Sequence, residues 1–335
     1  MKKFFFSILA VGALVACTKS EVKYEGETEI AFRPVASVAT KANVMHAIDG
    51  TDYPAEETFK VYAYWKSDKV AGTDHSEFAD AAKYIDGKEF AKAVDGALWR
   101  GAAKPYYWPK TGSMVFACFS PNTDPQVSNL KHDVVNDKFS FSYVSPNSGG
   151  KIDPSRTVDV MWTNTTASYS EATGKAGVPV TFKHALSWIT FKVLGDNVTS
   201  NGKFVINSLT MNDVKIMADF TSDDMKWDVK NTINQFPVFT GQRNLTTEAA
   251  VLENVSCGTL VVPQINNEEN YKATIEFTNN LGDTVINEVV TVDLGKGWEI
   301  GKHYTYYITF TATEILIEPH MEDWIEVDAA DQFIF

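Results

Sequence analysis

Six segments of this chain alternate between apolar and other side chains with a period of two, and this pattern restricts the fold more than any other feature. They are rich in Val, Ile, Thr, Tyr and Phe and span residues 58–65, 113–120, 138–144, 271–277, 284–292 and 303–312. Successive side chains of a strand point to opposite faces of a sheet, so this period predicts β-strands. Gly, Pro, Asn and Asp bound the segments, as expected where strands end in turns.

The connections between these segments are short and contain little helix. Residues 278–284 read as a hairpin connection, and Asp86-Gly87 is a second hairpin signal. The one helix-like stretch is 75–84, which Asp86-Gly87 would end. Strands at this spacing without intervening helices predict antiparallel β-sandwiches, so the expected fold class is all-β.

Chain length predicts two domains. About 300 residues remain after the N-terminal signal described below, too many for one small sandwich. A Ser-, Gly- and Lys-rich connection at 169–180 is the best boundary. We expect an N-terminal sandwich over 42–178 and a C-terminal sandwich over 179–335.

The first 17 residues read as an export signal. Two lysines precede an apolar run from Phe4 to Ala16, which is too short for a permanent membrane span. The run ends in Leu-Val-Ala-Cys, which resembles the lipobox of bacterial lipoproteins, so Cys17 is the predicted lipidation site and 1–16 the signal peptide. The alternative is a plain signal peptide that contains a cysteine. Residues 17–41 would then hold a polar tether and a first strand.

Net charge restricts the class of partner, and the surroundings of two cysteines predict where their side chains lie. The formal charge is −13, and removal of 1–16 takes away Lys2 and Lys3 and no acid, which gives −15. Such an acidic surface argues against nucleic acid as a partner. Cys118 and Cys257 lie in apolar surroundings, and we expect both to be small buried side chains; a bridge between them would require two domains to bring them together.

No catalytic or metal-binding motif is present in the sequence. The six histidines form neither a His-x-x-x-His pair nor a His-Glu-x-x-His motif, and no nucleophile elbow, Walker loop or dinucleotide fingerprint occurs. We therefore predict no enzyme activity, no cofactor and no metal. The aromatic residues within alternating strands are expected in the core; these are Tyr62, Tyr64, Phe116, Phe182, Trp188 and Phe191. Residues 104–110, with two prolines, are expected to be a bent strand entry that caps a core.

A good strand and an open joint lie next to each other near the N-terminus. Glu29 to Val38 alternates, with Ile30, Phe32, Ala36 and Val38 on one parity. The residues that follow are small and polar, and Lys41-Ala42 reads as a protease-sensitive bond.

Taken in order, these segments resemble the fimbrillin family, which comprises the type V pilus subunits and related surface lipoproteins of Bacteroidales. The resemblance rests on the lipobox, on IAF with its basic joint, and on FKVYAYW, YYWPKTGSMVFACFSP, DVMWTN, VPVTFKHALSWITFKV, LVVPQ, WEIGKHYTYYITF and IEPHMEDW. It implies two transthyretin-like β-sandwich domains in tandem. It also implies a palmitate-type lipid anchor in the cell outer membrane and structural or adhesive work in a fimbrium.

The resemblance also implies a route of assembly with two partners. A trypsin-like protease would cut after Lys41 and release the first strand, and a strand of another pilus subunit would fill the groove. An open groove exposes unpaired backbone groups and apolar pockets, which favour strand addition. Lys41 stands where Arg is usual in the family. A protease that requires Arg would leave the strand in place, and the protein would remain a lipidated surface subunit.

The C-terminus is the candidate donor strand. Its apolar residues share one parity, interrupted by Asp331; they are Ile325, Val327, Ala329, Phe333 and Phe335. Equally, 325–335 could be the last strand of its own domain. A second functional hypothesis is a surface lipoprotein that does not polymerise and binds glycans or other host or microbial surface ligands. Exposed rows of Trp and Tyr would favour this hypothesis, and buried aromatics with a coverable groove would favour the pilus subunit.

Overall fold

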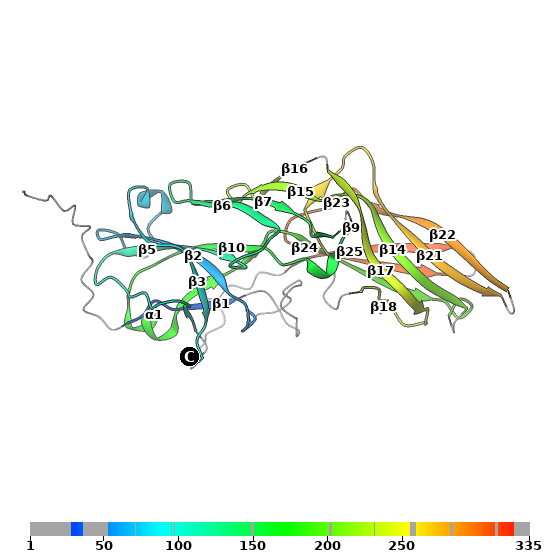
Figure 1. Ribbon diagram of the computed structural model, residues 1–335, viewed down its shortest axis with the longest axis horizontal. Helices are drawn as coiled ribbons and strands as arrows, with labels where there is room; N and C mark the ends of the chain where they lie inside the picture. Colours follow the sequence, from blue (N-terminus) through cyan, green and yellow to red (C-terminus); the bar gives the residue numbers. More distant parts are fainter. Residues whose placement is uncertain are drawn as a thin grey trace, which may run out of the picture.

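The computed structural model describes residues 28–35, 53–70, 72–94, 96, 98–148, 151–200, 203–230, 232–254, 259–281, 284–311 and 314–324. Within these ranges the molecule is elongated, with the N-terminal strands at one end and β14, β17, β21 and β22 at the other (Figure 1). One short α-helix, α1 (Glu171–Ala176), and two 3₁₀-helices accompany the described strands. The all-β prediction is confirmed.

The N-terminal half is built on one eight-stranded sheet. Its strands lie in the order β11 (Val178–Thr181), β1 (Phe32–Val35), β4 (Trp99–Gly101), β3 (Ala82–Lys92), β2 (Phe59–Lys66), β5 (Ser113–Ser120), β10 (Met161–Ala167) and β12 (Lys183–His184). β11 and β12 are at opposite edges although only Phe182 separates them in the chain. The sheet therefore curls back on itself, and the curl encloses an aromatic core that includes Phe59, Phe90 and Phe116.

A second sheet is shared between the two halves of the chain. Its order is β16 (Lys226–Val229), β15 (Met217–Thr221), β7 (Lys138–Val144) and β6 (Val127–Asp133). β7 pairs antiparallel with β15, and Phe141 lies opposite Phe220. This sheet runs along the upper side of Figure 1. Its apolar side chains belong to a middle core cluster that also contains Trp162 and Leu186.

The C-terminal half packs two further sheets around a third core cluster. One has the order β17 (Ile233–Asn244), β14 (Phe204–Lys215), β21 (Tyr271–Leu281) and β22 (Thr284–Gly295). The other has the order β18 (Ala250–Val251), β13 (Ser187–Gly195), β24 (Lys302–Phe310) and β25 (Ile315–Asp323), with β19 (Thr259–Val261) also paired to β13. The short pairs are β8 (Asn147–Ser148) with β9 (Lys151–Ile152) and β20 (Gln264–Ile265) with β23 (Gly297–Trp298).

The period-two segments are strands as predicted. β5 and β7 have the predicted bounds, and β2, β21, β22 and β24 differ from them by a few residues. β21 pairs antiparallel with β22 as far as Leu281 opposite Thr284, which confirms the predicted hairpin.

The helix expected over 75–84 is wrong. A 3₁₀-helix covers only His75–Phe78, and β3 begins at Ala82. β3 pairs with β2 on one side and β4 on the other, which buries Ile85 and Phe90 in the core. The pairing of β3 on both sides outweighs the local helical pattern because it satisfies the backbone and buries two large side chains.

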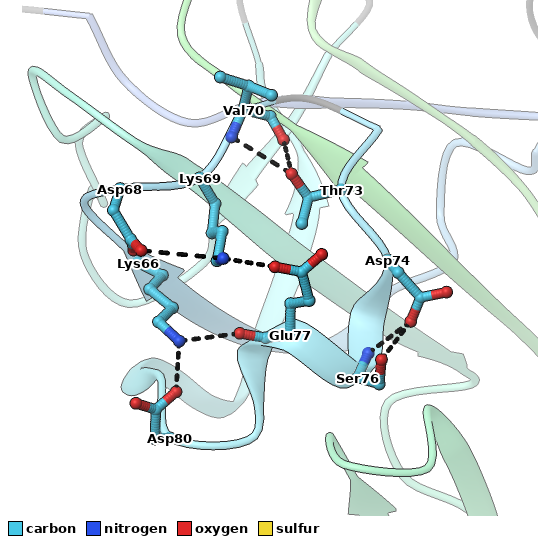
Figure 2. A network of polar contacts seen from close by, with 9 residues as sticks. All are labelled: Lys66, Asp68, Lys69, Val70, Thr73, Asp74, Ser76, Glu77 and Asp80. Atoms are coloured by element: carbon cyan, nitrogen blue, oxygen red, sulfur yellow. Dashed lines mark hydrogen bonds and ion pairs between the residues drawn. The ribbon is translucent and has the colours of Figure 1, made fainter.

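Polar contacts fasten this short helix to the end of β2 (Figure 2). Lys66 Nζ lies 2.5 Å from the Asp80 carboxylate and donates to the Glu77 carbonyl at 3.0 Å. At the start of the helix, the Asp74 carboxylate accepts from the Ser76 amide at 2.9 Å, a normal N-cap contact. Lys66 is half-buried and its partners are exposed, so these contacts fix the local path of the chain and add little stability.

The hairpin expected at Asp86-Gly87 is also wrong, since β3 runs through both residues. The register between β2 and β3 shifts between Val61 and Ala63, which places Asp86 and Gly87 together opposite Tyr62 as a β-bulge. Gly87 has φ +56°, and a Cβ there would lie 3.1 Å from the Tyr62 ring. The Asp-Gly pair thus supplies a left-handed bulge residue rather than a turn.

The division into two domains at 178/179 stays a prediction. β11 begins at Val178 and spans the predicted boundary, β12 follows it, and both hydrogen-bond within the N-terminal sheet, while β15 and β16 join the sheet of β6 and β7. Strands that follow the predicted boundary therefore join sheets that contain strands of the N-terminal half.

Candidate functional site

The first described strand lies inside the N-terminal sheet, between two neighbours. β1 pairs parallel with β11, where Phe32 faces Val178, and antiparallel with β4, where Phe32 faces Trp99. Ahead of β1, the Ile30 amide donates to the Tyr106 carbonyl at 2.6 Å. β1 is therefore paired on both edges, and residues 28–30 pair along one edge with residues 106–108.

Phe32 is at the centre of the aromatic core. Its ring is fully buried and makes edge-to-face contacts with the rings of Phe59, Phe90 and Phe116, with centroids 5.1 to 5.8 Å apart. Edge-to-face contacts place the positive edge of one ring on the negative face of another. Three such contacts converge on a residue that the sequence places close to the N-terminus.

The other predicted first-strand residues divide into two groups. Ile30 is fully buried, as expected, and belongs to the same cluster as Phe32. Ala36 and Val38 lie outside the described residues, as do Cys17, Lys41 and Ala42. The sequence analysis missed Pro34, which shares the parity of Phe32 and is buried; the same period-two pattern would have found it.

Two glycines near the end of the N-terminal half let the first strand approach closely. Gly177 ends α1 with φ +76°, and a Cβ there would lie 3.2 Å from the Phe32 carbonyl carbon and 2.9 Å from Leu98. A Cβ at Gly174, within α1, would lie 2.5 Å from the Thr28 side chain. α1 therefore covers the entry of the first strand, and Gly177 leads directly into β11. The connection predicted as a domain boundary is part of the site.

The segment 104–110, which contains two prolines, lies against the first strand and caps the N-terminal core. Trp108 is 5% exposed and packs on Phe116 with centroids 5.7 Å apart. Its amide donates to the Thr28 carbonyl at 3.2 Å, and Tyr107 forms a β-bridge with Glu29.

Tyr53 is a second residue that the sequence analysis missed. It is 2% exposed, its hydroxyl lies 2.7 Å from Ser120 Oγ, and its ring stacks on Phe182 at 5.2 Å. It also contacts Phe59 and Trp99. Tyr53 follows the predicted cleavage bond in the sequence, so cleavage would leave this part of the core intact.

Charged side chains near the first strand and near Tyr53 form an ion pair or have pKa values that burial shifts. The Glu29 carboxylate lies 3.4 Å from Arg100 Nε on β4. Burial lowers the pKa of Arg33 from its ordinary value. Burial, together with the negative charges of Glu56, Asp159 and Asp124, raises the pKa of Glu57 to about 7. Glu57 follows Tyr53 by one turn, where its carbonyl accepts from Trp99 Nε1 at 3.2 Å.

The described residues end at a buried aromatic anchor. Trp324 is 4% exposed and stacks on His184 with ring centroids 3.6 Å apart and an interplanar angle of 10°. Its amide donates to the Gly301 carbonyl at 3.0 Å. The predicted donor residues Ile325, Val327, Ala329, Phe333 and Phe335 lie outside the described residues.

The aromatic side chains are mostly internal. Phe116, Phe182, Phe191 and Tyr64 are buried as expected, and Tyr62 and Trp188 are half-buried. Among the described aromatics, only Tyr169 is largely exposed, at 45%. The described strands present no open row of Trp and Tyr.

Among the described residues, no cluster of three or more His, Cys, Asp or Glu side chains could hold a metal ion. No described helix has the length and apolarity needed to cross a membrane. Cys118 is a free, buried thiol, and burial raises its pKa; Cys257 lies outside the described ranges.

Comparison with known proteins gives consistent results. A family model described as fimbrillin-like matches residues 40–324. The fold is similar to a fimbrial protein from Bacteroides vulgatus, with TM-score 0.63 and 15% identity over 88% of this chain and 99% of that one. It is also similar to a candidate cell adhesion protein from Bacteroides uniformis, with TM-score 0.52 and 12% identity over 89% and 98% of the two chains. No curated protein sequence matches this one.

Proposed function

The chain belongs to the fimbrillin-like family, and from this premise we propose that it is a structural or adhesive fimbrial subunit assembled at the cell surface by strand exchange. In this proposal residues 42–178 and 179–335 are the two transthyretin-like sandwich domains. The precursor is exported by signal peptide 1–16 and held in the outer membrane by lipid on Cys17. Each buried acyl CH₂ contributes about 0.8 kcal/mol, so more than one acyl group gives a durable anchor.

The position of the first strand carries this proposal. β1 supplies Phe32 to the centre of the N-terminal core and is paired on both edges, yet it lies N-terminal to the predicted Lys41-Ala42 bond. Cleavage there by a trypsin-like protease would make the strand a separate peptide. Its departure would leave unpaired backbone on β11 and β4 and an empty aromatic pocket.

The energy of refilling this groove is large. Ile30 and Phe32 are each fully buried, and burial of such side chains contributes about 1.5–3 kcal/mol apiece. Restored strand pairing adds main-chain hydrogen bonds on two edges. A fibre joined in this way would dissociate slowly.

The donor in this proposal is residues 325–335 of another subunit. Trp324, the residue immediately before this segment, stacks on His184. The donor segment would therefore leave each subunit from a fixed point. Its apolar parity set, Ile325 to Phe335, matches the period of the groove.

Limited trypsin digestion tests the proposal on the protein that starts at residue 18. We expect one early cut after Lys41, loss of the N-terminal peptide by intact mass, and growth of a ladder on native gels. Lys19 and Lys23 precede the first strand, so cuts there leave it in place, and Arg33 precedes Pro34, a bond that trypsin cuts poorly; Lys41 is therefore the residue whose cleavage would release the strand. The Lys41→Gln variant is the matched control and should keep its first strand and stay monomeric. Cleavage that leaves a monomer with the peptide still bound contradicts strand exchange.

A glycan-binding surface protein is the second candidate, with surface ligands from host or microbe. It would need accessible aromatic faces, and the burial of most described aromatic side chains favours the fimbrial subunit.

A further inference from the structure

The edge strands of the described sheets differ in how well they are protected against pairing with another molecule. An exposed edge presents a row of free N–H and C=O groups, and proteins usually blunt it with Lys, Pro, bulges or short length. β22 is the exception here. Its twelve residues, 284–295, contain no Lys, Arg or Pro, and its pairing with β21 is regular except at the end near Tyr271.

The other long or exposed edges carry such protection. β17 contains Pro237 and pairs with β14 through three register shifts. β25 contains Pro319, and β6 contains Lys131 next to a register shift. β11, β12, β16 and β18 have two to four residues each. Among the described strands, β22 is the long edge without Lys, Pro or a register shift in its middle; its charged residues are Glu288 and Asp293.

The free edge of β22 is reachable and apolar. Val285 and Val289 are 63% and 67% exposed, and Ile286 is 39% exposed. A hollow of about 550 Å³ lies between residues 288–293 of β22 and the start of β25. No other described strand pairs with this edge of β22.

We propose that β22 pairs edge to edge with β22 of a second copy, related by a two-fold axis at Asn287. In this antiparallel register Val285 of each copy lies opposite Val289 of the other copy. The two Asn287 residues lie opposite each other at the axis. Apolar cross-strand pairs stabilise a sheet. The pairing joins two four-stranded sheets into one of eight strands.

Charge favours the register with its axis at Asn287 over the register shifted to place the axis at Glu288. A two-fold axis at Glu288 would place two carboxylates directly opposite each other, which is destabilising. With the axis at Asn287, each Glu288 lies opposite Ile286 instead. The contact is lateral and lies in the C-terminal half, away from the first strand, so it needs no cleavage at Lys41.

Cysteine cross-linking on the uncleaved protein from residue 18, with Cys257→Ser, tests the register. Residues directly opposite in an antiparallel pair have Cα atoms about 4.5–5.5 Å apart, within disulfide range. Asn287→Cys should therefore form a covalent dimer on mild oxidation. Val285→Cys alone should not, because its own copies would be about 13 Å apart, but it should cross-link when mixed with Val289→Cys. A homodimer through Cys at 286, 288 or 289 in place of 287 overturns the register.

Sedimentation equilibrium tests the interface itself. The unmodified protein should show a concentration-dependent dimer. Asn287→Lys places like charges at the axis and should weaken dimerisation at least about tenfold. Gln242→Lys, which adds the same charge on the opposite edge strand β17, is the control and should leave the dimer unchanged. A monomer at all concentrations, or a dimer insensitive to Asn287→Lys, overturns the proposal.

Discussion

At the residue scale, Phe32 shows how a single ring holds together a core that is built mostly from residues much later in the sequence. It contacts three phenylalanines, yet its strand lies N-terminal to the predicted Lys41-Ala42 bond. Gly177 permits this placement, because a Cβ at that position would crowd the Phe32 backbone.

Phe32→Ala should lower the free energy of unfolding by about 3–5 kcal/mol, because it removes a fully buried ring and leaves a cavity. Urea denaturation of the protein from residue 18 measures this change. Tyr169→Ala, at an exposed site, is the control and should cost far less. A loss under about 1 kcal/mol for Phe32→Ala would mean that the core collapses around the gap.

Glu57 should make stability fall as the pH rises. Its folded pKa is about 7, above the ordinary 4.5, so the folded state holds the proton more tightly than the unfolded state. The folded protein therefore loses stability between about pH 4.5 and 7 as this group ionises. Glu57→Gln should raise the melting temperature at pH 8 and change it little at pH 4.

The control for this prediction is Glu56→Gln. Glu56 is exposed and acts on Glu57 only through charge, so its effect at pH 8 should be smaller and of the same sign. Equal melting temperatures for Glu57→Gln and the parent at pH 8 would contradict a half-buried carboxyl with a raised pKa.

At the element scale, β1 is a strand that pairs on both edges but is separable from the fold by breaking one peptide bond. α1, β11 and the segment 106–108 surround it without being its neighbours in sequence. Another molecule can supply a strand inserted in this way. Main-chain hydrogen bonds and side-chain pockets bind the strand whether or not it is covalently attached to the fold.

A protein that starts at residue 42 should bind a synthetic peptide of residues 28–38. The same peptide with Phe32→Ala should bind roughly a hundredfold more weakly, since about 3 kcal/mol of burial is lost. Fluorescence anisotropy of a labelled peptide measures both affinities. Equal affinity for the two peptides would show that the Phe32 pocket does not accept the strand.

At the scale of the whole molecule, the sheet of β6, β7, β15 and β16 decides whether the halves behave as separate units. Two strands come from each side of the predicted boundary, and the middle core cluster runs between them. Breaking this sheet would expose apolar surface on both halves, so unfolding of one half should destabilise the other.

We therefore expect one cooperative unfolding transition. Phe32→Ala in the N-terminal core and Ile275→Ala in the C-terminal core should each shift that same transition, with coincident curves by near-UV circular dichroism and Trp fluorescence. Two transitions, each sensitive to only one variant, would show independent domains.

The sequence by itself determined six of the strands, because period two acts locally: β5 and β7 have their predicted bounds, and Ile30 and Phe32 face a core as their parity requires. It also placed the protein in its family through ordered motifs. Tertiary structure alone decided the rest. Residues from Ala82 onward became strand because β2 and β4 pair with β3, and Asp86-Gly87 became a bulge because β3 continues past it. The neighbours of β1, the shared middle sheet and the unprotected edge of β22 depend on contacts between residues far apart in the sequence, which no local pattern encodes.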